Sequence, residues 1–366
     1  MQLQFNRILT MKSYSIFLIL IVFSMVNPAS ARVELTDFFS DFTTSDVTIN
    51  SDTDFNGKAV FELLYSGELV ESHEVPVNVR AGEPLTKVII WQEKPQHDFY
   101  TATVTLYEGD RLVSKNSYHI AYGSATIPSF QVVDFSPSDS RVLLLLRSFN
   151  PTVADIKIEL LDNNDIVYSK TREDISITTS TDLQILWPFL LTDNKKYTVR
   201  AKIFSHRLYA PPLVNTYISG FTATDDVEIL PADVQVDEYG ASVTIQGKSQ
   251  VPFDGSIVVS AKNRAAGKAG ETHVYRQQLE DILTSGKEST AGVVWKGIAP
   301  GNYDVIIEAV NHKNITIDKY ETVLRIPEYP TANITSPANS TPGFEGVVFL
   351  IVLVVISVSI SRRLKV

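Results

Sequence analysis

The chain has 366 residues, with 42 Asp and Glu against 32 Lys and Arg, and it contains no cysteine. The absence of cysteine excludes both a disulfide framework and thiol chemistry. Without five basic residues at the two ends, 27 Lys and Arg face 42 Asp and Glu, and this balance of about −15 argues against nucleic acid or anionic lipid as a partner.

The first 31 residues have the order of a secretory signal peptide. Arg7 and Lys12 precede an apolar run from Ile16 to Val26, and Ala29-Ser30-Ala31 follows. This charged, apolar and then small-residue order predicts cleavage after Ala31. Met11 would begin a shorter and more conventional form of the same signal.

A short acidic stretch, "DTDFNG", is a weak candidate for a metal site. Asp52, Asp54 and Asn56 match the start of a calcium-binding loop, but Leu63 stands where the closing glutamate belongs. An incomplete loop in an acidic chain favours a plain turn leading into a strand. We therefore expect no metal and no cofactor.

Three tryptophans share one local setting and define an internal repeat. Each is followed eight to ten residues later by a tyrosine; the pairs are Trp91 and Tyr100, Trp187 and Tyr197, Trp295 and Tyr303. The period of about 100 residues predicts three domains. Their expected bounds are 32–125, 126–224 and 225–326.

Alternation of apolar and polar residues predicts strands in each repeat. Apolar side chains fall at every second position after each tyrosine, as in Val199, Ala201 and Ile203, with polar Arg200 and Lys202 between them. Gly, Asn and Asp break "LLYSGELVES", "TLYEGDRLVS" and "ELLDNNDIVYS" into hairpins. The only helix-like stretch, "HVYRQQLEDIL", is favoured as strand from its place in the repeat. The fold class is therefore all-β, with three tandem antiparallel β-sandwiches.

A tyrosine that opens a late strand resembles the tyrosine corner of immunoglobulin-like and fibronectin-like domains. This resemblance implies that the hydroxyls of Tyr100, Tyr197 and Tyr303 bond to backbone a few residues upstream. The stretch "AGEPLTKVIIWQEKPQHDFYTATVTLYEGDRLV" also looks like the extracellular modules called CARDB, which implies a role in adhesion.

Residues 327–342 predict an extended stalk, because four prolines alternate there with Ser, Thr and Asn. Asn333 and Asn339 lie in this stalk within glycosylation sequons, and Asn314 lies in a third sequon at a predicted turn.

The C-terminal end predicts a membrane anchor. Residues 343–361 form the expected transmembrane or sorting segment, whose apolar run is Val347 to Ser361, and 362–366 form a basic tail. This order places the body of the protein outside the cell. Pro342, Gly343 and Phe344, followed by this segment, resemble the PGF-CTERM sorting signal of archaeal surface proteins. The resemblance implies that an archaeosortase removes the segment and a lipid replaces it; an ordinary single-pass anchor is the alternative.

No catalytic motif is evident, so we expect no enzyme activity. The six histidines are scattered without metal-binding spacing, and neither a phosphate loop nor a GxSxG motif is present. The expected function is adhesion or envelope architecture at the cell surface, toward an extracellular protein or glycan. The alternative is a non-catalytic accessory subunit that docks onto a membrane transporter or an exported enzyme.

Overall fold

The computed structural model of the chain describes residues 32–121, 126–264 and 272–328. The predicted signal peptide, most of the stalk, the apolar segment and the basic tail lie outside these residues, as do Asn333, Asn339 and the sorting tripeptide Pro342, Gly343 and Phe344. Within the described residues, no helix has the length and hydrophobicity needed to cross a membrane.

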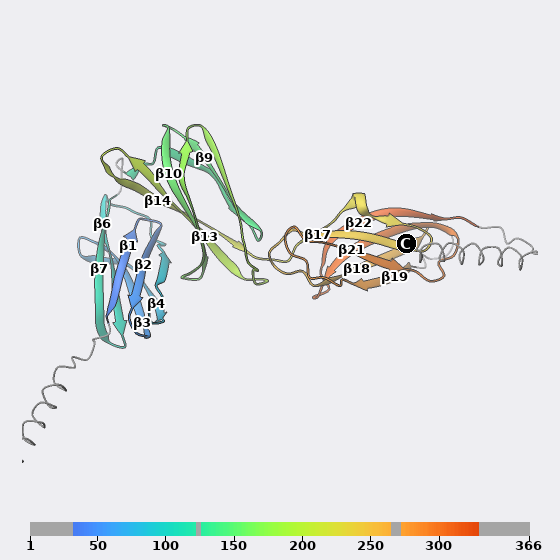
Figure 1. The fold of residues 1–366 in the computed structure, drawn as a ribbon, viewed down its shortest axis with the longest axis horizontal. Helices are drawn as coiled ribbons and strands as arrows, with labels where there is room; N and C mark the ends of the chain where they lie inside the picture. The colour runs from blue at the N-terminus through green and yellow to red at the C-terminus, as the bar shows by residue number, and fades with distance from the viewer. Residues whose placement is uncertain (1–31, 122–125, 265–271, 329–366) are drawn as a thin grey trace, which may run out of the picture.

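The described chain is built from strands that pair antiparallel, and it forms three successive units (Figure 1). The first unit contains β1 (Val33–Ser40), β2 (Thr44–Ser51), β3 (Phe55–Tyr65), β4 (Glu68–Val79), β5 (Leu85–Ile90), β6 (Phe99–Glu108) and β7 (Arg111–Ala121). The second contains β8 (Phe130–Pro137), β9 (Arg141–Ser148), β10 (Thr152–Asp162), β11 (Asp165–Ile177), β12 (Ser180–Leu186), β13 (Lys196–Arg207) and β14 (Ala210–Thr222). The third contains β15 (Val227–Ile229), the 3₁₀ turn η2 (Pro231–Asp233), β16 (Gln235–Val236), β17 (Gly240–Gly247), β18 (Gly255–Asn263), β19 (Thr272–Gln278), β20 (Glu288–Val294), β21 (Gly301–Asn311) and β22 (Thr316–Ile326).

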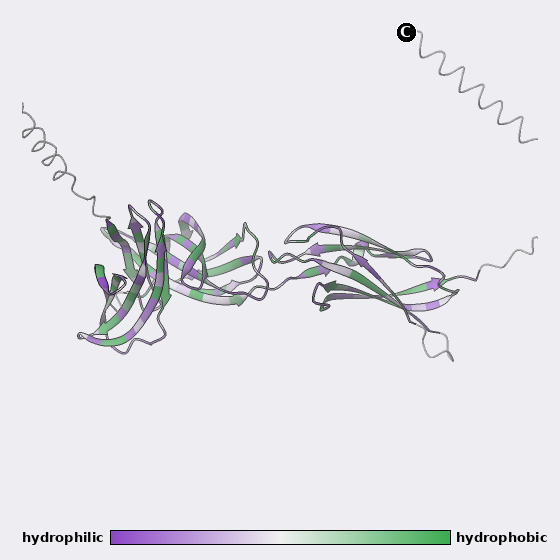
Figure 2. Ribbon diagram, turned by 90° about the horizontal axis from the view of Figure 1, so that it is seen from below, coloured by the Kyte–Doolittle hydropathy of each residue, from purple (hydrophilic) through white to green (hydrophobic). Residues whose placement is uncertain are grey.

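Each unit packs two sheets around its own hydrophobic core, as expected for a β-sandwich-like fold. In the first unit β1-β2-β5 faces β4-β3-β6-β7, and in the second β12-β9-β8 faces β11-β10-β13-β14. In the third β15-β17-β16, with β20 also on β17, faces β19-β18-β21-β22. Apolar and polar residues alternate along the strands (Figure 2), because one face of each sheet is buried.

The repeated tryptophans and tyrosines lie in these cores. All six are buried, and Ile89, Ile185 and Val293, two residues before the tryptophans, are buried beside them. The Tyr100 hydroxyl accepts a hydrogen bond from the Gln96 amide at 3.0 Å, and the Tyr197 hydroxyl accepts one from the Thr192 amide at 3.3 Å. The Tyr303 hydroxyl donates to the Ala299 carbonyl at 2.8 Å. Each hydroxyl therefore bonds backbone four or five residues upstream, as the tyrosine-corner resemblance implies.

The three predicted hairpins are confirmed, with turns at Ser66-Gly67, Gly109-Asp110 and Asn163-Asn164. Ser66 and Gly67 have φ angles of 48° and 85°, the left-handed values that a tight hairpin turn needs. The first six residues of the helix-like stretch, 273–278, lie in strand β19, as predicted, and its last five residues lie outside any strand.

Gly57 in β3 supports a prediction about close backbone approach. A Cβ atom on Gly57 would lie 2.1 Å from the Tyr107 carbonyl oxygen and 2.7 Å from the Phe55 ring. We expect Gly57→Ala to destabilise the first unit by about 1–3 kcal/mol, because the sheet must shift to admit the methyl group. Hydrogen exchange of peptides from β3 and β6 in increasing urea measures this loss.

Gly292 in β20 is the matched control, because a Cβ there has no neighbouring atom within 4 Å. Gly292→Ala should leave the third unit unchanged or slightly more stable. Equal protection of β3 in Gly57→Ala and the parent chain would contradict the expected clash.

Candidate functional site

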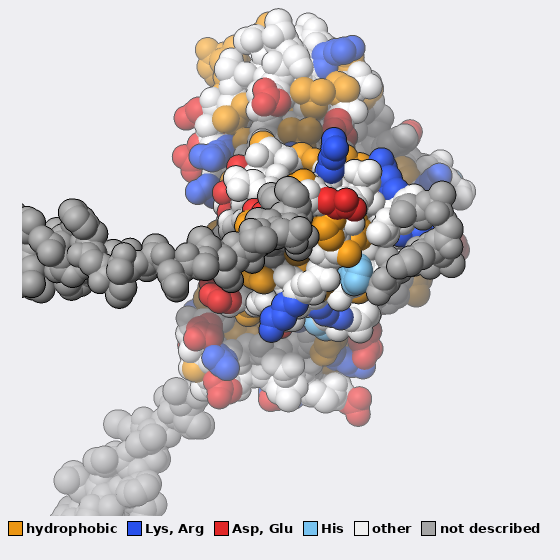
Figure 3. Space-filling view, turned by 90° about the vertical axis from the view of Figure 1, so that its right-hand side faces the viewer, with side chains coloured by type: hydrophobic (Ala, Val, Ile, Leu, Met, Phe, Trp, Pro, Cys, Tyr) orange, Lys and Arg blue, Asp and Glu red, His pale blue; other side chains and the backbone are white. Residues whose placement is uncertain are grey.

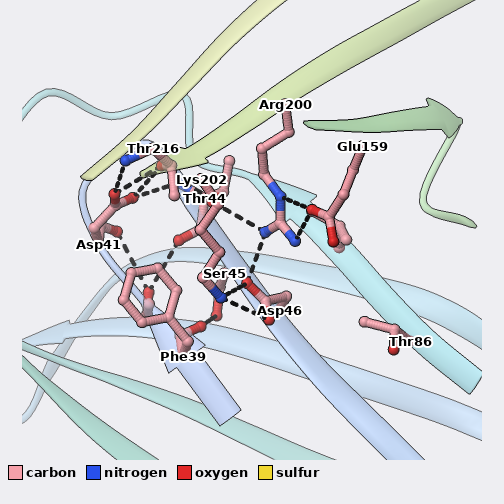
Figure 4. A network of polar contacts seen from close by, with 12 residues as sticks. Phe39, Asp41, Thr44, Ser45, Asp46, Thr86, Glu159, Arg200, Lys202 and Thr216 are labelled. Atoms are coloured by element: carbon pink, nitrogen blue, oxygen red, sulfur yellow. Dashed lines mark hydrogen bonds and ion pairs between the residues drawn. The ribbon is translucent and has the colours of Figure 1, made fainter. Parts of the chain in front are cut away.

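The outer face of β2 in the first unit packs against β13 in the second through a buried network of charges (Figure 4). Arg200 on β13 is 1 % exposed and joins two carboxylates. Its Nη1 donates to Asp46 Oδ2 at 2.6 Å and its Nε to Glu159 Oε2 at 2.7 Å. Lys202 Nζ also donates to Asp46 Oδ2, at 3.0 Å, and lies 3.9 Å from the centre of the Phe39 ring.

Burial and the neighbouring carboxylates shift the pKa values of the two cations of this network, in opposite directions. Burial lowers the pKa of the Arg200 guanidinium, but Asp46 and Glu159 outweigh burial and hold that pKa above its usual value. Burial also lowers the pKa of the Lys202 ammonium, and Asp46 offsets this only in part. Paired charges at this depth are stable only while each partner stays in place.

Asp41 extends the network to β14. Its carboxylate accepts the amide hydrogens of Thr43 and Thr44, at 2.8 and 2.9 Å, within its own turn. Across the interface it accepts the Thr216 amide at 2.9 Å and the Thr216 hydroxyl at 2.7 Å. Burial raises the pKa of the Asp41 carboxyl, although these donors oppose the effect.

A strand contact continues the same interface along the sheet. β5 pairs with β11 at Lys87 and Asp165, whose side chains form an ion pair at 2.6 Å. The Val88 amide donates to the Asn164 carbonyl at 3.0 Å, and Asn164 Nδ2 donates to the Val88 carbonyl at 2.8 Å. The order β1-β2-β5-β11-β10-β13-β14 is therefore one seven-stranded sheet shared by the two units.

The third unit joins the second end to end (Figure 1). Gln250 makes three hydrogen bonds across this joint, each at 3.0 Å: its amide donates to the Asp139 carbonyl, its carbonyl accepts from the Leu191 amide, and its Nε2 donates to the Trp187 carbonyl. Val251 packs into the core of the second unit, although it falls within the predicted third domain. The core therefore crosses the boundary expected from composition.

A pocket of about 730 Å³ opens at one end of the first unit. Its lining residues come from the β3–β4 hairpin, the β5–β6 loop and the ends of β6 and β7; they are Leu64, Tyr65, Ser66, Gln96, His97, Asp98, Phe99, Tyr100, Thr101, His119, Ile120 and Ala121. Leu64, Thr101 and His119 are neighbours in register across β3, β6 and β7. We call this the aromatic pocket.

Stacked rings shape the wall of the aromatic pocket. The rings of Tyr65 and His97 are parallel, with centroids 3.7 Å apart and an interplanar angle of 9°. The Tyr100 ring lies 5.6 Å from Tyr65. Phe99 is 71 % exposed, which is unusual for a phenylalanine at the start of a strand.

Glu71 on β4 holds the β5–β6 loop that carries this wall. Its carboxylate accepts the amide hydrogens of Gln92 and Glu93, each at 3.0 Å, and bonds His73 Nε2 at 2.6 Å. Partial burial raises the pKa of the Glu71 carboxyl, but the two amides and His73 outweigh burial and hold the pKa below its usual value of 4.5. The ionised carboxylate therefore stabilises the loop.

This pKa shift predicts a pH dependence of the loop. Because the pKa of Glu71 is lower in the folded state, its stabilisation is present above the unfolded value of 4.5 and is lost as the pH falls through the folded value. We expect the hydrogen-exchange protection factors of the Gln92 and Glu93 amides to fall as the pH is lowered below 4.5. In Glu71→Gln they should already be low at pH 7, and unchanged protection in that variant would contradict the role of the carboxylate.

The described residues hold one group of three side chains that could bind a metal, Asp155, Asp174 and His206, with ligand atoms within 4.8 Å of one another. His206 Nε2 pairs with Asp155 Oδ2 at 3.0 Å, and the Asp174 amide donates to Asp155 Oδ1 at 2.9 Å. The Asp174 amide and then His206 hold the pKa of the Asp155 carboxyl below its usual value. These contacts account for Asp155 without a bound ion.

The same end of the second unit exposes apolar side chains. Leu208 is 88 % exposed and Tyr209 is fully exposed at the tip of the β13–β14 hairpin. Tyr209 has a φ of 60°, a left-handed value that is costly for an aromatic residue. Phe149, which lies before β10, and Val153, its second residue, are also exposed. We call Phe149, Val153, Leu208 and Tyr209 the apolar tip.

The weak calcium candidate is placed in a turn and a strand. The Asp54 carboxylate accepts the Ala81 amide at 2.9 Å, and Asn56 and Gly57 pair with β4 inside strand β3. Leu63, which stands in place of the closing glutamate, is buried in the core. Asp52 and Asp54 therefore lie in a turn and Asn56 lies in strand β3, so the twelve residues from Asp52 to Leu63 do not form one continuous loop.

The sequon at Asn314 lies in the exposed turn between β21 and β22, as the sequence predicts. Arg276 Nη1 donates to Asn314 Oδ1 at 2.9 Å.

On the end of the molecule seen in Figure 3, acidic and basic side chains are interspersed.

Sequence reasoning missed both the charge network and the aromatic pocket. Residues of the network are up to 175 positions apart in the chain, as in Asp41 and Thr216. One signal for the pocket was available, because Phe99 directly precedes buried Tyr100 and so must face away from the core.

No protein-family model matches this chain, and no curated protein matches it. Among solved structures, red sea bream transglutaminase is similar over 56 % of this chain and 32 % of its own, with 9 % identity and a TM-score of 0.27. Dimeric latent PorU from Porphyromonas gingivalis is similar over 81 % of this chain and 34 % of its own, with 10 % identity and a TM-score of 0.21. The chain thus spans about a third of the length of each, and at these TM-scores neither likeness bears on function.

Proposed function

We propose that this chain is a non-catalytic protein of the outer cell surface, held by a C-terminal anchor of the archaeal PGF-CTERM kind. Its three immunoglobulin-like modules act in adhesion or envelope architecture by holding binding surfaces away from the membrane. The signal peptide, the stalk and the basic tail predicted from the sequence support this placement.

The observation that carries the proposal is the coupling of the first two units. A flexible string of domains loses affinity when binding orders it, whereas pre-organised surfaces avoid that loss. Arg200, which Glu159 of its own unit also holds, pairs with Asp46 of the first unit in a buried interface, and Gln250 bonds the third unit to the second. Such construction suits a rod that positions a binding surface.

Cross-linking in intact cells tests the proposal. A lysine-reactive cross-linker is applied to cells, and peptides joined to residues 32–326 are identified by mass spectrometry. We expect links to further copies of the chain or to the abundant wall lattice. Links confined to cytoplasmic proteins would overturn the surface placement.

The exposed apolar tip favours a second candidate function, that of an accessory subunit. A group of exposed apolar side chains is typical of docking to another protein. In that case the cross-links would join the chain in fixed ratio to one transporter or exported enzyme. The double variant Leu208→Ser and Tyr209→Ser would remove those links. Leu112→Ser is the control, because Leu112 is also exposed but lies in the first unit, and it would leave the links unchanged.

A further inference from the structure

The lining of the aromatic pocket restricts the charge of its ligand. Among its twelve lining residues, all of them described, there is no Lys, Arg or Glu, and Asp98 is the one carboxylate. A phosphate, sulfate or carboxylate ligand would find no permanent cation there. A ligand with several positive charges would find one carboxylate, that of Asp98, to balance them.

The same lining combines apolar rings with hydrogen-bonding groups. Phe99 is 71 % exposed and His97 is exposed, so both rings are available to a ligand. Gln96, Asp98 and Thr101 add amide, carboxylate and hydroxyl groups around them. A purely apolar ligand would leave these polar groups without water or partners, which is costly.

A sugar ring has the chemistry that matches this mixture. The C–H groups of a pyranose are weakly positive and pack against the negative face of an aromatic ring, while its hydroxyls bond amides and carboxylates at the rim. The pocket volume of about 730 Å³ lies within the usual range of small-ligand sites, about 300–1,000 Å³. One or two sugar rings fit that range.

The wall of the pocket is fixed before a ligand arrives. The Tyr65 ring holds the plane of His97 by stacking, and the Tyr100 hydroxyl holds the Gln96 amide at 3.0 Å. Glu71 fixes the start of the same loop through Gln92 and Glu93. Because the groups are already ordered, binding costs less conformational entropy.

We propose that the aromatic pocket binds a neutral saccharide, with Phe99 and His97 packing on a sugar face and Gln96 and Asp98 bonding its hydroxyls. This rests on the proposed surface function, since glycans are ligands met outside the cell. It assigns the partner class to a defined site in the first unit.

A binding experiment with the full chain tests this assignment. The probes are the methyl glycosides of glucose, galactose, mannose and N-acetylglucosamine and their disaccharides, titrated and followed by saturation-transfer NMR. We expect at least one to bind, and Phe99→Ala and Asp98→Asn to weaken that binding about tenfold. Both residues are exposed, so the variants should keep the parent melting temperature.

Leu112→Ala is the matched control, because Leu112 is 55 % exposed at the far end of β7 in the same unit. It should bind the probe as the parent chain does. Failure of every neutral probe, or binding that persists in Phe99→Ala, would overturn the assignment. Binding only of sulfated or phosphorylated sugars would overturn the assignment of a neutral saccharide as the ligand.

The outcome is distinguishable from failure of the proposed function. A chain that forms surface cross-links in cells but binds none of the probes loses the saccharide assignment alone. A chain that binds a probe in solution but is cross-linked only to cytoplasmic proteins loses the proposed surface function alone.

Discussion

Replacing Arg200 with methionine is expected to destabilise the joined first and second units by about 3 kcal/mol. The change keeps most of the side-chain volume but removes the cation that bonds Asp46 and Glu159. Both carboxylates then remain buried with fewer donors, which costs more than the original pair contributes. Lys202 and Lys157 still neutralise one carboxylate each, so the loss should lie at the lower end of the range for broken buried pairs.

Calorimetry and hydrogen exchange of the full chain measure this effect. In the parent chain we expect peptides from β2 and β13 to exchange together, because the network makes the two units cooperative. In Arg200→Met the first unit should open at lower denaturant concentration, before the second.

Arg111→Met is the control, because Arg111 also pairs with a carboxylate, that of Glu108, but its side chain is 74 % exposed. A surface pair of this kind contributes little, so the variant should lie within about 0.5 kcal/mol of the parent. Equal stability of Arg200→Met and Arg111→Met would contradict the expected cost of leaving Asp46 and Glu159 buried without Arg200.

Trp187→Ala is expected to destabilise the second unit by about 3–5 kcal/mol. The indole is 1 % exposed, stacks parallel to Phe221 with centroids 6.4 Å apart and meets Tyr168 edge-on. Removing it leaves a cavity that the two sheets cannot close. It also removes the hydrogen bond of 2.8 Å from the indole nitrogen to the Ser138 carbonyl.

The loss should spread to the joint with the third unit, because the Trp187 carbonyl accepts from Gln250 Nε2. Urea-dependent hydrogen exchange should show faster opening of peptides around residue 250 as well as of β9 and β12. Phe149→Ala is the control, since Phe149 is 62 % exposed in the same unit and should change stability little. An equal loss of hydrogen-exchange protection in the second and third units would contradict a cavity confined to the second unit.

The repeat and its strands could be predicted because they depend on local pattern. Tryptophan, a tyrosine eight to ten residues later and alternating apolar residues identify a core-facing strand wherever they occur. The β3–β4 hairpin turn at Ser66-Gly67 could also be predicted from local sequence, since few residue pairs adopt two left-handed φ values.

The interface between the first two units could not be predicted, because alternation of apolar and polar residues does not show what covers the outer face of a sheet. Arg200 and Lys202 alternate with core residues, which places them on the face of β13 that points away from the core of their own unit. They do leave the core of their own unit, but the first unit covers that outer face. Alternation reports which face a side chain takes, and it cannot report what lies against the second face.

The position of Val251 limits how such a protein can change by recombination. Its side chain completes the core of the second unit, while its backbone belongs to the loop before β18. If a gene segment were exchanged at the boundary near residue 225, a residue from another protein would replace Val251 in the core of the second unit. The last two units should therefore be inherited as a pair, and a duplicated or transplanted copy should carry both.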